Sequence, residues 1–318
     1  MRRLLLILVV VVVLLGAAGA AIGLRTGSGN VDGTVTLTVT RDFGAESVGG
    51  EPKKDAQQGD TVMRALQRDY EVKTRYGGGF VQEIEGLSGG RENGRPVDWF
   101  YYVNGIEAGK GAAQTRISPG DRIWWDRHVW QAAQRIPAVV GSFPEPFLAG
   151  SGGRRIPVQL LCEGAGHSCG EVEERLGDAG VTSVSRSTVP LTGGQGKEVL
   201  RVIVGPWSQV RADPVARTIE QGPQASGVYA RFSSDGRQLD LLDELGQSVR
   251  TLHAGGGLIA ATAQQDQQPT WVITGTDAVG VDAAAAALQI NRLNRHFALA
   301  VAAGRDVPLP TALPGTGP

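Results

Sequence analysis

Cysteine is scarce in this sequence, and so are the short motifs that mark common catalytic and metal-binding sites. Two cysteines in 318 residues exclude a disulfide-dense scaffold and a four-cysteine zinc site. The sequence contains no H-E-x-x-H, S-x-x-K, G-x-G-x-x-G, P-loop or EF-hand run. None of its four histidines (His128, His167, His253 and His296) stands at metal-ligand spacing from another. We therefore expect a protein that is not an enzyme, with no catalytic residue, no metal site and no cofactor.

A surplus of charge of either sign is missing as well. The 31 Lys and Arg residues nearly balance the 32 Asp and Glu residues, so a broad nucleic-acid-binding surface is not expected. Hydrophobic residues make up 41% and charged residues 20% of the chain, as in folded proteins. The length of 318 residues predicts two domains or one large domain.

An uncharged apolar run from Leu4 to Leu24 follows two arginines at the start of the chain. As a helix it would be about 31 Å long, enough to cross the core of a bilayer. Residues 1–25 are therefore either a signal anchor or a signal peptide that is cleaved after Ala20. We favour the anchor, which predicts a single-pass protein of the cell membrane that contacts the bilayer through residues 4–24. Most of the chain would then lie outside the cytoplasm, and cleavage would make the protein secreted.

The rest of the chain predicts an α+β fold. Residues 34–130 combine alternating strand patterns with one helix, which we expect Asp60 to cap. Residues 131–153 form a connector rich in Pro and Gly. Residues 154–305 show a strand–loop–helix–strand pattern three times, which favours a second domain built as an α/β sandwich. The composition of residues 306–318 predicts a disordered tail.

The aromatic run Trp99–Val103, the turn Asn104-Gly105 and the segment Gly120–Trp125 together resemble a known family. They are similar to the transcobalamin C-terminal-domain-like modules of bacterial surface and secreted proteins, a domain family of unknown function. The resemblance covers residues 34–130. The matching positions are Trp99, Tyr101, Val103, Asn104, Gly105, Gly120, Asp121, Ile123 and Trp125. It implies a β-grasp-like fold for the first domain and, by analogy alone, contact with cobalamin. The second domain resembles the companion region of actinobacterial members, and that likeness implies no activity.

Two groups of residues are candidate ligand sites. The first consists of Trp99, Tyr101, Trp124 and Trp125. Strand alternation places Trp99, Tyr101 and Val103 on one face and Phe100 and Tyr102 on the other, so one face is expected to form the core. The other face is either covered by packing or open for stacking on a sugar or a flat macrocycle.

The second group lies where strands of the second domain are expected to end. Gly205-Pro206-Trp207 and Gly275-Thr276-Asp277 each follow a strand and precede a helix. Ligands gather at the carboxyl ends of strands in α/β sheets, and helix N-termini favour anions. The candidates there are Trp207, Arg211, Thr274 and Thr276. Ordinary turn chemistry is the alternative interpretation of these segments.

The two cysteines, Cys162 and Cys169, flank a six-residue loop. In an exported chain we expect them to form a disulfide that fixes a strand to the following helix. A Cys–His nucleophile and a metal site, each using His167, are the alternatives. Ser168 and Glu171 have the spacing of a capping box at the start of that helix.

These patterns favour a membrane-anchored or secreted binding or interaction protein that is not an enzyme. Its partner is expected to be a small molecule or a protein of the cell envelope. One alternative, which rests on the family resemblance, is an accessory role in the uptake of a corrinoid or another small solute. Another is an envelope enzyme that uses the second domain, near Thr274–Asp277 and Arg211.

Overall fold

The computed structural model describes residues 34–50, 53–56, 60–187 and 198–311, in which strands outnumber helices. The fold is a mixture of α and β structure, as the sequence predicts. The apolar run 4–24 and the cleavage site after Ala20 lie outside the described residues. Among the helices that are described, none is both long enough and apolar enough to span a membrane.

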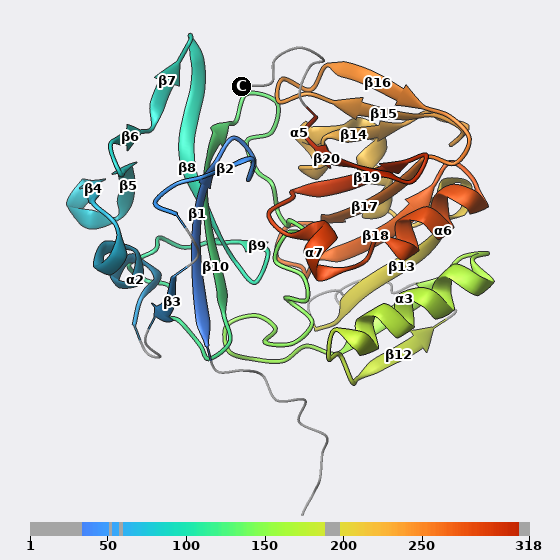
Figure 1. The fold of residues 1–318 in the computed structure, drawn as a ribbon, viewed down its shortest axis with the longest axis horizontal. Helices are drawn as coiled ribbons and strands as arrows, with labels where there is room; N and C mark the ends of the chain where they lie inside the picture. The colour runs from blue at the N-terminus through green and yellow to red at the C-terminus, as the bar shows by residue number, and fades with distance from the viewer. Residues whose placement is uncertain (1–33, 51–52, 57–59, 188–197, 312–318) are drawn as a thin grey trace, which may run out of the picture. The chain divides into compact units, whose positions relative to one another are not determined.

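The first sheet is mixed, with a parallel pair at its centre (Figure 1). Its main path runs β2-β1-β10-β8-β7, while β3 pairs with β1 and β9 pairs with β8. The strands are β1 (Val35–Arg41), β2 (Glu46–Ser47), β3 (Lys53–Ala56), β7 (Gly90–Glu92), β8 (Arg95–Val103), β9 (Ile106–Glu107) and β10 (Arg122–Val129). β1 lies parallel to β10, and β10 lies antiparallel to β8. The expected turn at Asn104-Gly105 joins β8 to β9, and both of its residues have positive φ, as a type I′ turn requires.

Helix α2 (Val62–Asp69) packs on this sheet through its apolar face. The helix begins one residue later than expected, because Thr61 rather than Asp60 is the cap: the Thr61 hydroxyl accepts the Arg64 amide at 3.3 Å. Asp60 instead forms an ion pair with Arg68. A small antiparallel sheet follows α2, and its strands are β4 (Val72–Arg75), β5 (Phe80–Ile84) and β6 (Leu87–Ser88). A short 3₁₀ turn, η1 (Tyr76–Gly78), joins the first two.

The second large sheet has the order β12-β11-β13-β18-β17-β19-β20. Its strands are β11 (Val158–Cys162), β12 (Val184–Ser187), β13 (Leu200–Pro206), β17 (Gly257–Thr262), β18 (Thr270–Gly275), β19 (Ala298–Ala302) and β20 (Arg305–Leu309). The four strands from β12 to β18 are parallel, and the remaining three are antiparallel. β17 and β18 are buried along their whole length, and β13 is buried up to Pro206, because packing covers both faces of the sheet.

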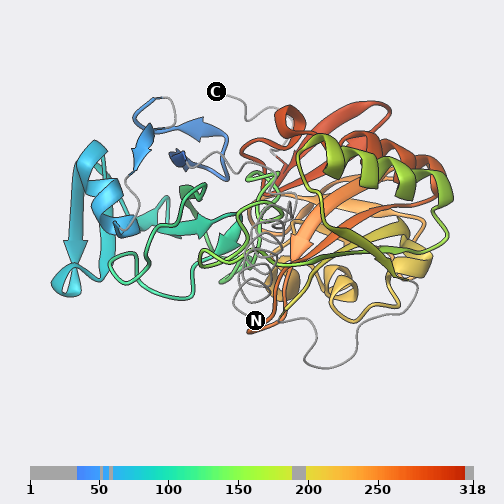
Figure 2. The same ribbon diagram turned by 90° about the horizontal axis from the view of Figure 1, so that it is seen from below.

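Alternate residues of these strands belong to two hydrophobic clusters on opposite faces. Leu160 and Val202 pack with α3 (Gly166–Asp178) and α6 (Ala278–Ala286). Leu161 and Ile203 pack with the segments after β13. Those segments are α4 (Trp207–Val210), η3 (Ala216–Gln221), α5 (Pro223–Ser226) and a sheet of β14 (Ala230–Phe232), β15 (Leu239–Leu242) and β16 (Ser248–Leu252). The second sheet therefore lies between two layers, as a sandwich requires (Figures 1 and 2).

Only the first of the three expected strand–loop–helix–strand units pairs its own strands side by side. In that unit β11 and β12 flank α3 in the chain and lie parallel. After β13 the chain enters β14, which belongs to a different sheet. After α6 and the short α7 (Ile290–Leu293), β19 pairs antiparallel with β17 rather than with β18. The local pattern specifies a strand but not the neighbour with which it pairs.

Two segments without a regular pattern are more ordered than the sequence suggests. Residues 138–150 of the connector are almost all buried, and Phe143 and Phe147 pack on Trp271. Residues 306–309, expected in a disordered tail, belong to β20, which pairs with β19. Pro308 in this segment argued against a strand, although an edge strand tolerates proline. Residues 312–318 lie outside the described residues.

Candidate functional site

Three of the four aromatic candidates on β8 and β10 belong to the core beneath α2. Trp99, Tyr101 and Trp125 pack there, and the rings of Tyr101 and Trp125 stack with centroids 4.7 Å apart. Trp99 and Trp125 are only 5% and 2% exposed. Tyr101 is partly exposed, but its hydroxyl donates to the Lys110 carbonyl at 2.5 Å. These rings are therefore held as core and offer no open stacking face.

The opposite face of β8 and β10 contacts Phe297, which precedes β19 of the second sheet. The ring centroid of Phe297 lies between 5.1 and 5.7 Å from those of four residues at the first sheet, in edge-to-face geometry. We call these residues the Phe297 cluster: Phe43, Tyr102, Trp124, His128 and Phe297. All five are buried. Of the two interpretations of the aromatic faces, the structure agrees with packing, and the second sheet supplies the cover.

A buried carboxylate, Asp126, anchors the polar side of the Phe297 cluster. It accepts the Thr40 hydroxyl at 2.5 Å and two backbone amides, and its Oδ1 lies 2.8 Å from His128 Nδ1. The Thr40 hydroxyl in turn accepts the Trp124 indole N–H at 2.7 Å. The His128 ring is stacked between Phe43 and Phe100. Because His128 is 1% exposed and Asp126 is fully buried, this pair is part of the core.

The second predicted group is brought together only in part. Trp207 and Thr274 share one sheet edge, because Gly205 lies opposite Thr274 in the pairing of β13 with β18. Both side chains are fully buried. The Thr276 hydroxyl donates to the His253 carbonyl at 2.7 Å. These groups are used in turns and packing, as the alternative interpretation holds.

Glu220 of η3 was not singled out from the sequence, but it binds two of the predicted residues, Trp207 and Arg211. Its Oε1 accepts the Trp207 indole N–H at 3.1 Å and the Arg211 Nε–H at 2.6 Å. Burial by itself raises the pKa of Glu220. The hydrogen bonds from Arg211 and Trp207 and the charge of Arg211 together outweigh this effect, so the pKa is lowered. Arg211 therefore has its counter-ion within the protein.

The crevice where ligands bind in many α/β sheets is closed here. In the sheet, β11 and β13 are neighbours. The chain leads from β11 through α3 to β12, which lies beyond β11, whereas β18 lies on the opposite side, beyond β13. The order of the strands therefore diverges between β11 and β13, which is where such a crevice would lie. The loop after β11 crosses that point. The Glu163 amide donates to the Val204 carbonyl at 2.7 Å, and a Cβ at Gly205 would lie 2.1 Å from the Glu163 carbonyl oxygen. The backbone itself fills the space.

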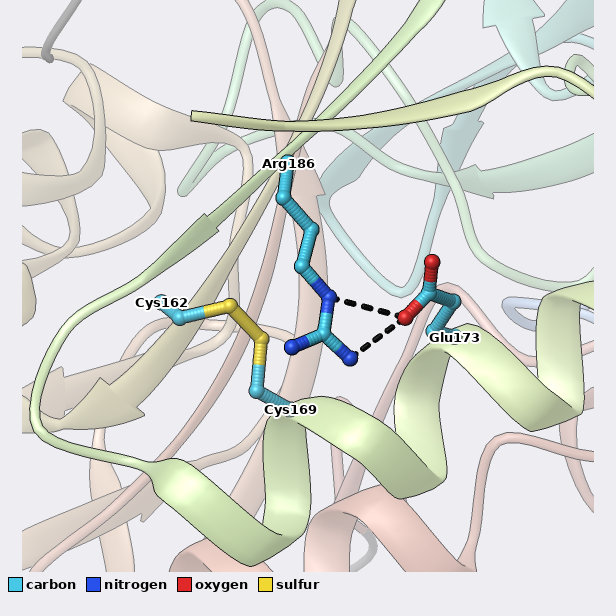
Figure 3. The surroundings of a disulfide bond; sticks show 4 residues. All are labelled: Cys162, Cys169, Glu173 and Arg186. Atoms are coloured by element: carbon cyan, nitrogen blue, oxygen red, sulfur yellow. Dashed lines mark hydrogen bonds and ion pairs between the residues drawn. A yellow bond between two sulfur atoms is a disulfide. The ribbon is translucent and has the colours of Figure 1, made fainter. Parts of the chain in front are cut away.

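The expected disulfide is present. Cys162 at the end of β11 is bonded to Cys169 in α3. Beside it, Arg186 of β12 forms a two-pronged ion pair with Glu173 of α3 (Figure 3). Both contacts tie α3 to its flanking strands. The Cys–His and metal alternatives do not apply to a pair of bonded cysteines, and among the described residues no cluster of His, Cys, Asp or Glu is suited to hold a metal ion.

Replacing both cysteines with serine is expected to lower the free energy of unfolding by about 2.5 kcal/mol, because the bond closes a short loop and restricts the unfolded chain. Urea unfolding of the oxidised wild type and the double variant measures the difference. The variant's own insensitivity to reductant is the control. A wild-type midpoint that does not move when the disulfide is reduced would contradict the prediction.

Two G-x-S-x-G runs, Gly86–Gly90 and Gly166–Gly170, were not among the predicted sites. The second follows a strand and opens a helix, which is the context of a nucleophile elbow. Here, however, Ser168 lies within α3, is 4% exposed and donates its hydroxyl to Asp282 of α6. This position also overturns the expected capping box, since α3 begins after Ala165. Ser88 is bonded to Glu83 on the small sheet. Neither serine is bonded to a histidine.

Open cavities occur away from all eight predicted ligand residues. One of about 230 Å³ is lined by the connector, the start of β11 with the residues before it, and the segment that precedes β12; its lining includes Phe147, Ile156 and Val181. Another of about 430 Å³ lies beside α2, and its polar lining residues are Thr61, Arg64, Gln67 and Arg116. The first is mainly apolar, and the second carries two cations.

Comparison with known protein families gives a match for one segment of the chain. Residues 59–128 match a domain of unknown function, DUF4430. This match begins just before α2 and ends in β10, so it includes the aromatic strands but leaves out β1. No curated protein matches the chain.

Two solved structures share a limited likeness with this chain. One is a "putative metal binding protein" from Ruminococcus gnavus, with 15% identity and a TM-score of 0.25 over 30% of this chain and 96% of that one. The other is haptocorrin in complex with Cbi, with 12% identity and a TM-score of 0.22. That match covers 31% of this chain and 27% of the haptocorrin chain.

Proposed function

We propose that this protein is a non-enzymatic binding protein that acts outside the cytoplasm. The observation that carries the proposal is that its reactive side chains are used in structural bonds, whereas its cavities are lined by other groups. Ser168, Cys162, Cys169 and the Asp126–His128 pair are all committed to structural bonds. The open cavities are lined instead by apolar and cationic groups, which bind rather than react.

The proposed location rests on the disulfide and on the N-terminal sequence. Disulfides persist in oxidising compartments and are rare in the cytosol, so the Cys162–Cys169 bond supports export. The apolar run 4–24 would serve as the membrane anchor. Cleavage after Ala20 would release the same folded part as a secreted protein.

The family resemblance adds a finer proposal about the first sheet. We take residues 34–130 to be a β-grasp-like module of the transcobalamin type, supported by the parallel pairing of its first and last long strands across one helix. The corrinoid alternative needs an open face on this module. Because Phe297 and its neighbours cover the aromatic face, binding of a flat macrocycle there would require the two sheets to separate.

Native mass spectrometry of the full chain in mild detergent tests the binding function. The protein is incubated with extract of its source cells and, separately, with cobalamin and cobinamide. We expect a retained small-molecule mass from the extract and none from the corrinoids. A corrinoid adduct would favour the uptake alternative. Turnover of an extract component in place of retention would favour an enzyme, and absence of any adduct would contradict the binding proposal.

A further inference from the structure

We propose that the cavity beside α2 binds an acidic sugar, meaning a sugar that carries a phosphate or a carboxylate. The proposal rests on the binding function above and names its ligand class. The cavity volume of about 430 Å³ lies within the range of about 300–1,000 Å³ that is usual for ligand pockets. Hydrogen-bonding groups of Thr61 and Gln67 line it together with Arg64 and Arg116, and its described lining includes no carboxylate.

The two arginines in the cavity have no counter-ion among the residues that the structure describes. Within the part of the chain that the structure describes, no ion pair or side-chain hydrogen bond involves the guanidinium of Arg64 or Arg116, whereas the nearby Arg68 is paired with Asp60. Both side chains are exposed and both line the same hollow. Guanidinium groups have a planar fork of N–H donors that matches carboxylate and phosphate oxygens. The cavity therefore has two cationic donors available for an anionic group.

The local field adds to this positive charge. Helix α2 has no acidic residue in its first turn, and Arg64 lies there instead. The N-terminal end of a helix carries partial positive charge, so a cation in the first turn is unfavourable. A bound anion would relieve the repulsion between the helix end, Arg64 and Arg116. The Thr61 hydroxyl already accepts the Arg64 amide, so it offers the ligand its own O–H as a donor.

Hydrogen bonds fix the main chain at both arginines before any ligand arrives. The segment that carries Arg116 lies against the start of α2. The Val62 amide donates to the Thr115 carbonyl at 2.9 Å, and the Ile117 amide donates to the Asp60 carbonyl at 2.9 Å. Thr61 and Arg116 form an isolated bridge between the two segments. Ordering of the main chain is therefore not part of the cost of binding.

An exposed aromatic ring, close in sequence to one lining residue of the cavity, favours a sugar over a bare anion. Tyr76 in η1 is 86% exposed, in contrast to the buried aromatics of the first sheet. It precedes by two residues Gly78, which lines the cavity. The Phe80 ring centroid lies 6.3 Å from that of Tyr76. Exposed aromatics of this kind mark interaction sites and stack on flat faces of ligands.

Isothermal titration calorimetry of the full chain tests this assignment with four probes: glucose 6-phosphate, glucuronate, glucose and inorganic phosphate. We expect the two acidic sugars to bind with a Kd below about 1 mM and glucose to bind at least about tenfold more weakly. The double variant Arg64→Gln/Arg116→Gln is expected to weaken the acidic sugars at least about tenfold. The matched control Arg237→Gln/Arg250→Gln removes two exposed arginines from the region of β14–β16 and is expected to change nothing.

The variant Tyr76→Ala separates the sugar from the anion. It should weaken the binding of glucose 6-phosphate and leave the binding of inorganic phosphate unchanged. Equal effects on the binding of both probes would show a site for anions alone and overturn the sugar assignment. Retention of the same extract-derived ligand by wild type and Arg64→Gln/Arg116→Gln would overturn this site but leave the binding function intact. A wild-type protein that binds no probe and retains no ligand would contradict both.

Discussion

Replacing Phe297 with alanine is expected to lower the free energy of unfolding by about 3–5 kcal/mol, the usual cost of removing a buried phenyl ring. Phe297 is 3% exposed and contacts aromatic rings that belong to the other sheet. The substitution would leave a cavity whose walls come from two sheets with different backbone connections, so the site has little freedom to collapse. We also expect the two sheets to separate more easily, which would open the connector 131–153 to proteases.

Urea unfolding followed by tryptophan fluorescence measures the first effect, because Trp124 lies 5.1 Å from Phe297 and reports its loss. Limited proteolysis under native conditions measures the second. Tyr76→Ala is the control, since it removes a ring that is 86% exposed. A loss below about 1 kcal/mol, which is typical of surface substitutions, would show that the Phe297 cluster does not hold the sheets together.

The stability of the protein is expected to fall by about 3 kcal/mol between pH 4.5 and pH 7 through Glu145 alone. This connector residue is 3% exposed, and burial raises its pKa from 4.5 to about 7. The Ala149 amide, which donates to Oε2 at 2.8 Å, and the charge of Arg122 oppose the shift only in part, and Asp121 adds to it.

The direction follows from which state releases the proton first. Above pH 4.5 the unfolded chain loses the Glu145 proton while the folded protein keeps it, so the folded state loses stability as the pH rises, until both states are ionised above pH 7. The variant Glu145→Gln should remove this slope, because a neutral amide replaces the protonated carboxyl. Urea unfolding at intervals from pH 4.5 to pH 8 compares it with wild type and with the surface control Glu174→Gln. Parallel curves for wild type and Glu145→Gln would contradict the prediction.

Local sequence patterns predicted which side chains of a strand share a face, and they did so well where one face is apolar. The alternation in β8 correctly assigned Trp99 to one layer and Tyr102 to the other. The Asn104-Gly105 turn followed from the φ values that its residues tolerate. The Cys162–Cys169 bond followed from the short spacing of the two cysteines in a chain that the sequence predicts to be exported. Each of these inferences needed only neighbouring residues.

The residues that pack against these side chains could not be predicted from the sequence, because they come from distant parts of the chain. The alternation of residues predicts on which face of the sheet Trp124 lies. Nothing near Trp124 in the sequence indicates that Phe297 packs against it. Glu220 likewise stands in an unremarkable helix pattern, yet it binds both Trp207 and Arg211. The cavity arginines were missed for the same reason, since Arg64 and Arg116 meet only when two separate segments pair.

The parallel pairing of β1 with β10 has a consequence for how the protein is made. Thr36 of β1 lies opposite Arg122 of β10, so β1 must wait for a neighbour that is synthesised much later. Such long-range pairing is slow to form, and an unpaired strand edge invites association with other chains. If the chain is exported from its N-terminus, as we propose, β1 is presented early, before β10 is available. For the same reason, a fragment cut at residues 59–128 would lack β1 and expose the edge of β10.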